Sequence, residues 1–458
     1  METKPFTSLS LRPELLQALD SLEYREMTPI QALSLPLMLE GKDVIGQART
    51  GSGKTAAYGL GLLSRIDPTL TKTQALVLCP TRELADQIAK EIRRLARCLP
   101  NVKLTILSGG ISKRPQLASL EHDPHIVVGM AGRVQEHLTS GTLKLEDLRV
   151  LVLDEADRML DSDFEQASRA IVDQAPKGRQ TLFFSATFPD SVRAVSKRLQ
   201  KQPVEASIDT AAVTGQVTQS FFEVTPEHRV DALAHLLSVH RPESALVFCY
   251  TRGDAQEVES ALRKRGYSVL GLHGEIDQRE RDEVLVRFGN GSSRVLVATD
   301  IAARGLDIKN LAAVISYELP ADPDAHVHRV GRTGRAGQNG IALHLFSSRE
   351  RSRVSAIEQR LGIKVTPEKL AAFSADRPLP TTMTTLCVDG GRSDKLRPGD
   401  LLGALTGDAG IAKEAIGKIN TFDTRTYFAI DRKQAKRALD ALREGKIKGK
   451  KFRVRSID

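Results

Sequence analysis

The sequence of 458 residues contains no tryptophan, only four cysteines and few aromatic residues. The cysteines are scattered without a CxxC pair, so neither a disulfide framework nor a zinc site is expected, and a reducing compartment fits. Because phenylalanine and tyrosine make up only 4% of the chain, any site that relies on aromatic stacking must use few side chains. No apolar run reaches about 18 residues, and the first residues lack a basic segment followed by an apolar stretch. We therefore expect a cytoplasmic protein without a membrane span or a secretory signal.

The composition is otherwise ordinary, but the charge is unevenly distributed. Hydrophobic residues make up 41% and charged residues 27%, which excludes wholesale disorder, and the length suggests about three domains. Of the net charge of +9, residues 380–458 carry +7, from 17 Lys and Arg against 10 Asp and Glu. A basic module attached to a nearly neutral body is typical of a protein that binds a polyanion, most simply nucleic acid.

Short apolar runs alternate with amphipathic helical patterns over most of the chain. This alternation predicts parallel strands that are covered by helices on both faces. A polar stretch at 209–216 divides eleven such runs, more than one sheet usually holds, and therefore predicts two α/β domains. The C-terminal residues show a βαββαβ pattern instead. We predict domains at 1–208, 217–365 and 381–458.

A glycine-rich segment, Ala48–Thr55, has the pattern AxxxxGK[ST] between a short strand and a helix. Its glycines allow backbone N–H groups to surround phosphate oxygens at the positive end of the helix. Lys54 would reach the β- and γ-phosphates of a nucleotide, and the Thr55 hydroxyl would hold Mg²⁺. A plain glycine-rich turn before a helix is the alternative interpretation.

The acidic tetrad Asp154–Asp157 follows a buried strand, at the end where parallel sheets bind ligands. Asp154 would hold Mg²⁺ through water, and Glu155 would orient and deprotonate an attacking water. By itself such a tetrad is usually a solvated turn. Its position downstream of Lys54 favours a metal and base site.

A basic segment, His328–Arg335, lies in the second predicted α/β domain. Phosphoryl transfer needs positive charge near the departing group, and arginine fingers supply it. A solvated basic loop is the alternative interpretation. Because the other domain offers a phosphate loop and an acidic site, we predict one nucleotide site that both domains share.

These motifs together resemble those of the DEAD-box RNA helicases, over nearly all of residues 6–345. Further matching segments are Met27–Gln31, Pro80–Ala85, Gly109–Gly110, Ser185–Thr187, His273–Gln278 and Ala298–Asp307. The resemblance implies two tandem RecA-like parallel-sheet domains that bind ATP and Mg²⁺. The catalytic residues that it implies are Lys54, Asp154, Glu155, Arg332 and Arg335.

The resemblance also assigns contacts to the nucleotide. Gln31 would pair with the adenine edge, since its amide donates and accepts at once, with Phe6 nearby. Phe6 could equally be a core anchor for the N-terminal segment. Asp307 would bind the ribose beside Gly305. The predicted cofactor contacts are Phe6, Gln31, Thr50, Gly51, Ser52, Gly53, Lys54, Thr55, Gly305 and Asp307.

Coupling and RNA contacts follow from the same resemblance. Ser185, Thr187 and His328 would couple the state of the γ-phosphate to closure of the domains. The first two could equally satisfy backbone groups at a strand end. The implied RNA contacts are small, hydroxylic or basic, and would follow the RNA backbone and 2′-OH groups rather than the bases. They are Arg82, Gly110, Arg133, Arg252, Gly274 and Thr299.

Four residues at two sites depart from the family pattern. Glu23 and Met27 replace the usual glycine and proline before Gln31. Met130–Ala131 replaces the Thr-Pro pair that normally precedes Gly132. A phosphate-binding hydroxyl is lost at this second site, which leaves more of the RNA affinity to the C-terminal module.

Residues 381–458 resemble a degenerate RNA recognition motif (RRM), an α+β fold. Only Tyr427, Phe428 and Phe452 offer aromatic rings, so little stacking on the sheet is expected. The segment 443–455 instead contains seven basic residues and one acidic residue, and the alternative to RNA binding is a solvated basic surface. Phosphate contacts would come from Lys446, Lys448, Lys450 and Lys451.

A DEAD-box core with this module resembles the bacterial DbpA subfamily. The resemblance implies RNA-stimulated ATP hydrolysis with local duplex unwinding, and a module that grips a hairpin of 23S rRNA during assembly of the large ribosomal subunit. RNA and pre-50S particles would be the partners, and we favour a monomer. An ATP-switched RNA clamp or chaperone with little strand separation would use the same motifs. A DNA translocase fits the twin core but not the DEAD, SAT and Gln31 set.

Overall fold

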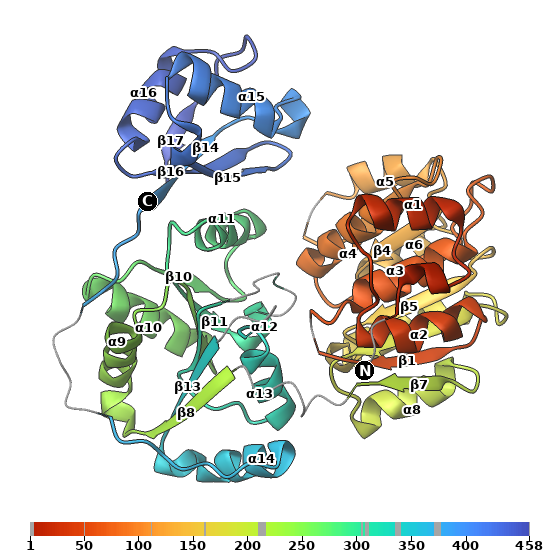
Figure 1. Cartoon of the computed structure of the whole chain (residues 1–458), viewed down its shortest axis with the longest axis horizontal. Coiled ribbons are helices and arrows are strands. Elements are labelled where there is room, and N and C mark those ends of the chain that lie inside the picture. The colour runs from red at the N-terminus through yellow and green to blue at the C-terminus, as the bar shows by residue number, and fades with distance from the viewer. Residues whose placement is uncertain are drawn as a thin grey trace. The chain divides into compact units, whose positions relative to one another are not determined.

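The computed structural model (Figure 1) describes residues 4–49, 51–110, 112–159, 162–208, 217–303, 306, 311–334, 340–370 and 377–457, and only the backbone of 162–165. The described residues up to 208, with Leu306, form one compact unit, and those from 217 onward form the other. None of the described helices is long and apolar enough to cross a membrane.

Seven described strands form the sheet of the first unit, in the order β3-β4-β2-β5-β6-β1-β7, and every neighbouring pair is parallel. Val150 and Val152 of β5 join one core cluster, while Leu151 and Leu153 join a second, so both faces of the sheet are covered. The strands are β1 (Val44–Gln47), β2 (Ala75–Leu78), β3 (Leu104–Leu107), β4 (Ile126–Gly129), β5 (Val150–Asp154), β6 (Gln180–Ser185) and β7 (Val204–Ser207).

Helices that bury one apolar face cover this sheet. In α4, Leu84, Ile88 and Ile92 recur at helical spacing and are buried, and the preceding Thr81 caps the helix by accepting from the Leu84 backbone N–H at 3.3 Å. The helices are α1 (Pro13–Ser21), α2 (Pro29–Leu39), α3 (Lys54–Arg65), α4 (Arg82–Leu95), α5 (Arg114–Leu120), α6 (Ala131–Thr139), α7 (Ser162–Asp173) and α8 (Asp190–Leu199).

Six described strands form the parallel sheet of the second unit, in the order β10-β11-β9-β12-β13-β8. The order reverses between β9 and β12, and open α/β sheets bind ligands at such a point. The strands are β8 (Val217–Glu223), β9 (Ala245–Cys249), β10 (Val269–Leu272), β11 (Val295–Thr299), β12 (Ala313–Ser316) and β13 (Gly340–Phe346). The helices are α9 (Arg229–His240), α10 (Arg252–Lys264), α11 (Gln278–Gly289), α12 (Asp300–Ala303), α13 (Pro323–Val330) and α14 (Arg351–Leu361).

The C-terminal module has an antiparallel sheet, and its described strands follow the order β15-β16-β14-β17. Two helices lie on one face, where Leu386, Phe428 and Leu442 belong to a single core. The elements are β14 (Met383–Val388), α15 (Pro398–Gly403), β15 (Ile416–Thr421), β16 (Thr426–Asp431), α16 (Ala435–Glu444) and β17 (Val454–Ser456). The predicted RRM-like α+β fold is confirmed.

The other face of this small sheet packs against α11 within the second unit. The buried apolar contact is made by Val286, Cys387, Tyr427 and Ile457. The Asn290 amide donates to the Thr385 hydroxyl at 2.9 Å, and that hydroxyl lies 2.7 Å from Ser292 Oγ. Tyr427 and Phe428 are 2% and 0% exposed, so these two rings are not available for stacking with RNA bases.

Two histidines are buried side by side in the second unit. His326 of α13 and His344 of β13 are 1% and 0% exposed, and their ring centroids lie 4.6 Å apart. One nitrogen of each ring is hydrogen bonded, to Gln219 and Ser316 respectively, while the other has no partner among the described residues. Burial, reinforced by the positive charge of Arg329, lowers the pKa of His326 to about 3, and burial also lowers the pKa of His344.

We expect acid to destabilise the second unit through this pair. Because both pKa values lie below the unfolded value of about 6.5, the unfolded chain binds more protons than the folded chain below that pH. The free energy of unfolding should fall from about pH 6.5 downward, by up to about 1.4 kcal/mol per pH unit for each ring. Hydrogen exchange of β13 at about pH 7.5 and about pH 5.5, corrected for intrinsic rates, measures the change. Replacing both histidines with Gln should flatten the dependence; an unchanged slope in the double variant contradicts the assignment.

Candidate nucleotide site and RNA-binding surface

The phosphate loop joins β1 to α3 in the first unit. Gly51 and Gly53 have φ angles of 87° and 92°, a region that glycine adopts without a steric penalty. A Cβ on Gly53 would lie 2.5 Å from Gln31 Nε2, so the close approach also requires glycine. Lys54 begins α3, is 7% exposed and donates to the carbonyl of Ala48. The Lys54 side chain therefore links the start of the loop to the N-terminus of α3, which is the positive end of that helix.

Gln31 connects the start of α2 to this loop. Its Oε1 accepts from the Thr28 backbone N–H at 2.8 Å, and its Nε2 donates to the Gly53 carbonyl at 3.1 Å. The amide retains one more lone pair and one more N–H, the groups that would read adenine, so its adenine contact stays a prediction. Phe6 is 3% exposed and lies in the core with Met27, as the core-anchor alternative requires.

Asp154 ends β5 with a carboxylate that is almost fully buried. It accepts from the Tyr58 hydroxyl at 2.7 Å and from the Glu155 backbone N–H at 2.9 Å. Burial raises the pKa of Asp154 to about 6, although the positive charge of Lys54 opposes the shift. A divalent cation would offset the cost of burying this charge, so the site fits Mg²⁺. The described residues contain no group of three or more His, Cys, Asp or Glu side chains that could hold a metal ion. Thr55 and Asp154 are the residues that would hold it, together with nucleotide phosphates.

Glu155 follows in a conformation that is rare for a side-chain-bearing residue. Its φ and ψ angles are 54° and 47°, in the left-handed region, which costs about 1 kcal/mol or more. Arg158 Nη1 lies 3.1 Å from Glu155 Oε2 and anchors the carboxylate within the turn. Backbone strain of this kind is common at functional sites, which fits the predicted role of Glu155 as the base.

Asp157 ties the acidic turn to the turn after β6. Its backbone N–H donates to Ser185 Oγ at 3.3 Å, and its carboxylate accepts from the Thr187 hydroxyl at 2.5 Å and from the Thr187 N–H at 3.2 Å. Sequence reasoning missed this role of Asp157 and also missed Tyr58. Tyr58 lies four residues after Lys54, so helical spacing could have placed it on the same face.

In the second unit, Arg329 anchors α13, the helix in which the basic segment begins. It is 1% exposed, pairs with both carboxylate oxygens of Asp300 and donates to the Glu318 carbonyl at 2.6 Å. His328 lies on the same helix, and Arg332, 5% exposed, follows its end. The predicted contacts Thr50, Gly305, Asp307 and Arg335 lie outside the described residues.

The two α/β sheets present a similar four-residue segment at equivalent strand ends. Residues 79–82 (CPTR) follow β2, and residues 249–252 (CYTR) begin with the last residue of β9. Strands β2 and β9 both lie third in their sheets, after β3-β4 and after β10-β11. Thr81 and Thr251 each accept from the backbone N–H three residues later, at 3.3 and 3.1 Å, so each caps the helix that begins with the next arginine.

The other predicted RNA residues also lie at carboxyl ends of strands. Gly110, with φ 73°, follows β3, and Gly274 follows the equivalent strand β10. Thr299 ends β11 and accepts from the Ala302 N–H at 3.3 Å. Arg133 lies in the first turn of α6, which follows β4, and pairs with Glu136 at 3.1 Å. Each unit therefore gathers its predicted RNA contacts along one edge.

Comparison with known proteins identifies the family. Residues 28–195 match the DEAD/DEAH box helicase family, residues 228–337 the helicase conserved C-terminal domain, and residues 385–456 the DbpA RNA binding domain. Over 453 residues the chain is 51% identical to the ATP-dependent RNA helicase DbpA of Escherichia coli K12, which covers 99% of both chains. The chain belongs to the DEAD-box ATP-dependent RNA helicases.

This DEAD-box helicase has more distant relatives as well. It is 41% identical to the DEAD-box ATP-dependent RNA helicase CshA of Geobacillus kaustophilus over 355 residues, which covers 77% of this chain and 76% of the relative. Its structure resembles Saccharomyces cerevisiae Dbp5 bound to RNA and ADP BeF3, with a TM-score of 0.73 and 30% identity, over 80% of this chain and 96% of Dbp5. The two predicted RecA-like domains are confirmed, and the helicase is an ATP-hydrolysing enzyme that binds RNA.

The departures from the family pattern have local structural effects. Glu23, which stands where the family pattern has glycine, has φ 60°, in the left-handed region that glycine adopts without a steric penalty and that costs another residue about 1 to 2 kcal/mol. Met27 is 3% exposed and fills the core. Met130 precedes α6 without a side-chain cap, where threonine would supply one. The helicase therefore lacks one hydroxyl at this predicted phosphate contact.

The four predicted RNA-binding lysines of the C-terminal module lie on its surface. Lys446, Lys448, Lys450 and Lys451 are all exposed. Lys448 Nζ donates to the Lys395 carbonyl at 3.1 Å and lies 3.6 Å from the carboxylate of Asp400, so its charge is partly balanced. The other three lysines lie within six residues of one another in the segment between α16 and β17.

Proposed function

We propose that this helicase docks its C-terminal module on a structured segment of 23S rRNA in pre-50S particles and unwinds a short neighbouring duplex as ATP is hydrolysed. The observation that carries the docking role is the concentration of charge: residues 380–458 hold +7 of the net +9, and the four lysines above are exposed. The subfamily resemblance supports 23S rRNA as the target. Domains at 1–208, 217–365 and 381–458, a monomeric state and a cytoplasmic location belong to the same proposal.

The chemistry of the nucleotide site follows from its geometry. Mg²⁺ held by Thr55 and Asp154 would neutralise charge on the phosphates of bound ATP. Lys54 contributes a second positive charge to those phosphates. Glu155 orients the attacking water and accepts its proton, while Arg158 holds the carboxylate of Glu155 within 3.1 Å.

The remaining predicted residues sense and complete the reaction. Arg332 and Arg335 stabilise charge on the departing γ-phosphoryl group. Asp157 transmits loss of that group to Ser185 and Thr187, because it bonds both of them. RNA phosphates are bound along the strand ends of both sheets, so domain closure on ATP bends one strand of a duplex away from the other. The core RNA contacts are Arg82, Gly110, Arg133, Arg252, Gly274 and Thr299.

A strand-displacement assay tests this function. The substrate is a short RNA duplex joined to a hairpin that the module binds, with a matched duplex joined to a scrambled hairpin as control. We expect ATP-dependent displacement that is faster on the first substrate, and ATP hydrolysis that RNA stimulates and DNA does not. ATP hydrolysis without displacement would favour the RNA clamp, and equal stimulation by DNA would favour a DNA translocase.

A further inference from the structure

Tyr250 is an exposed aromatic residue of the helicase core, the part of the chain that contains the two α/β sheets. It follows β9 and is 54% exposed, whereas the other large exposed hydrophobic residues among those described are aliphatic. They are Leu33, Leu117, Val239, Ile301 and Ile363. Single exposed apolar side chains are common on protein surfaces, so exposure alone assigns no role. The residues that surround the ring indicate its role.

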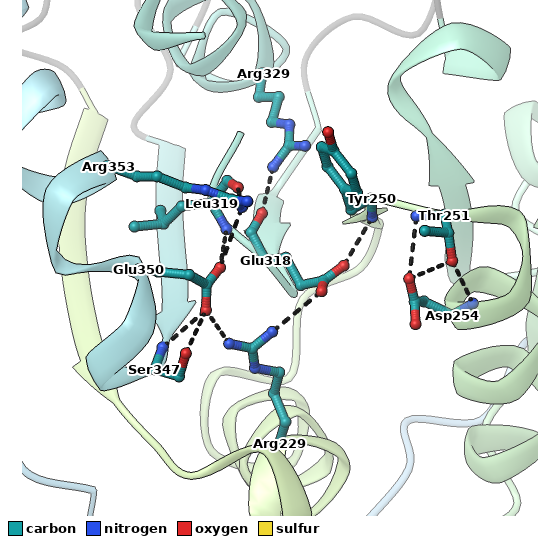
Figure 2. Close-up of polar contacts among 10 residues, drawn as sticks. All are labelled: Arg229, Tyr250, Thr251, Asp254, Glu318, Leu319, Arg329, Ser347, Glu350 and Arg353. Atoms are coloured by element: carbon teal, nitrogen blue, oxygen red, sulfur yellow. Dashed lines mark hydrogen bonds and ion pairs between the residues drawn. The ribbon is translucent and has the colours of Figure 1, made fainter. Parts of the chain in front are cut away.

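A partly buried polar network contacts the backbone of Tyr250 (Figure 2). Its backbone N–H donates to Glu318 Oε2 at 2.9 Å, and Arg229 lies 3.4 Å from Glu318 Oε1 on the other side. Arg229 is 6% exposed and also pairs with Glu350. The Tyr250 backbone N–H is therefore bound by a carboxylate that is itself paired with Arg229.

Arg353 lies against the Tyr250 ring. The guanidinium carbon of Arg353 lies 5.4 Å from the ring centroid, and its Nη1 donates to the Leu319 carbonyl at 2.6 Å. Arg353 also lies 3.5 Å from a carboxylate oxygen of Glu350, so it has partners on two sides. The guanidinium therefore makes a cation–π contact with the ring, and more than half of the tyrosine surface remains open to solvent.

The location of Tyr250 indicates the ligand. Tyr250 immediately precedes Thr251, which caps α10, and lies two residues before Arg252, which we propose to lie along the RNA backbone. It stands where β9 meets β12, the point at which the strand order reverses and where open α/β sheets bind ligands. The equivalent position in the first sheet is Pro80, which has no aromatic ring. Proteins that bind single strands combine charged contacts to the backbone with aromatic rings on which bases stack.

We propose that Tyr250 is a stacking platform for one nucleobase of the bound RNA strand. The inference rests on the proposed function, since it places a base beside the phosphate that Arg252 would hold. Every base has a π-face, so the platform accepts all four bases. RNA binding by the helicase core then depends on the presence of a base at one position, but not on which base it is.

An abasic scan of the RNA tests the platform. Single-stranded oligoribonucleotides, each with one abasic residue at a different position, are used to stimulate ATP hydrolysis by the full chain. For the wild type, we expect one abasic position to raise the half-saturating RNA concentration about 5- to 10-fold, with unchanged turnover at saturating RNA. Tyr250→Leu should show the same rise on intact RNA and no further rise at that position. Tyr250→Phe, which keeps the ring, should remain within about twofold of the wild type.

Controls separate this inference from the proposed function. Val239→Ala shortens an aliphatic side chain that is 58% exposed in the same unit, and it should leave the RNA dependence unchanged. If no abasic position weakens the wild type, or if the effects of Tyr250→Leu and the abasic residue multiply at every position, the platform is refuted while RNA-stimulated hydrolysis stands. If intact RNA fails to stimulate the wild type, the proposed function itself fails.

Discussion

Replacing Glu155 with Gln is expected to lower the rate of ATP hydrolysis by about 100- to 10,000-fold while ATP binding is retained. Glutamine keeps the size of the side chain but cannot accept the proton of the attacking water. The Arg158 contact loses its charge and keeps an acceptor oxygen, so the turn should survive. Phosphate release at saturating ATP and RNA measures turnover, and binding of a fluorescent ATP analogue measures affinity.

The control for this prediction is Glu40→Gln, which removes a carboxylate from an exposed site of the same unit and should leave turnover unchanged. Asp154→Asn provides a contrast, because loss of the buried charge should weaken Mg²⁺-dependent ATP binding as well as turnover. RNA-stimulated hydrolysis that persists in Glu155→Gln refutes the assignment of Glu155 as the base.

Replacing the four surface lysines of the C-terminal module with Gln is expected to abolish most of the preference for the hairpin-linked substrate. The lysines are Lys446, Lys448, Lys450 and Lys451. Each lost phosphate contact should reduce the slope of log affinity against log salt concentration by about 0.7 to 0.9, so the four together should reduce it by about 2 to 3, allowing for the pairing of Lys448 with Asp400. We expect affinity for the hairpin at low salt to fall by about 10- to 100-fold. Titrations at several salt concentrations measure both.

A matched variant loses the same charge elsewhere in the module. It replaces the exposed Lys413, Lys418, Lys433 and Lys436 with Gln. If hairpin binding depends on the segment between α16 and β17, this variant should retain the preference for the hairpin-linked substrate. Equal losses in the two variants would mean that net charge alone attracts RNA. Basal hydrolysis stimulated by unstructured RNA should persist in both variants, because the core contacts are intact.

The sequence predicted most of the fold because the central strands are continuous apolar runs. Val150–Leu153 is buried on both faces of its sheet, and such a strand has a distinct pattern. The edge strand β7, Val204–Ser207, was not predicted. Only Ala206 in it is fully buried, so the strand lacks the continuous apolar run by which the central strands were recognised. The burial of Tyr427 against α11 was also missed, since a tyrosine on a strand gives no sign of what covers its face.

The candidate site was predictable where its chemistry is local in the sequence. A glycine loop with a lysine, or an acidic tetrad after a strand, has a fixed spacing that any fold of this class would display. The partners of those motifs are not local. Asp157 bonds Ser185 and Thr187, 28 and 30 residues further along the chain, and only the pairing of β5 with β6 brings them together.

The seam between α11 and the C-terminal sheet limits how the module can be transplanted. Val286, Asn290 and Ser292 belong to the helicase core, yet they cover Tyr427 and bond Thr385 of the module. A graft of residues 381–457 alone onto a different helicase would expose the apolar face formed by Cys387, Tyr427 and Ile457. It would also remove the hydrogen-bond partners of the Thr385 hydroxyl. A functional chimera must also contain the face of α11 that packs against the module. The segment to be transferred is therefore larger than the RNA-binding domain.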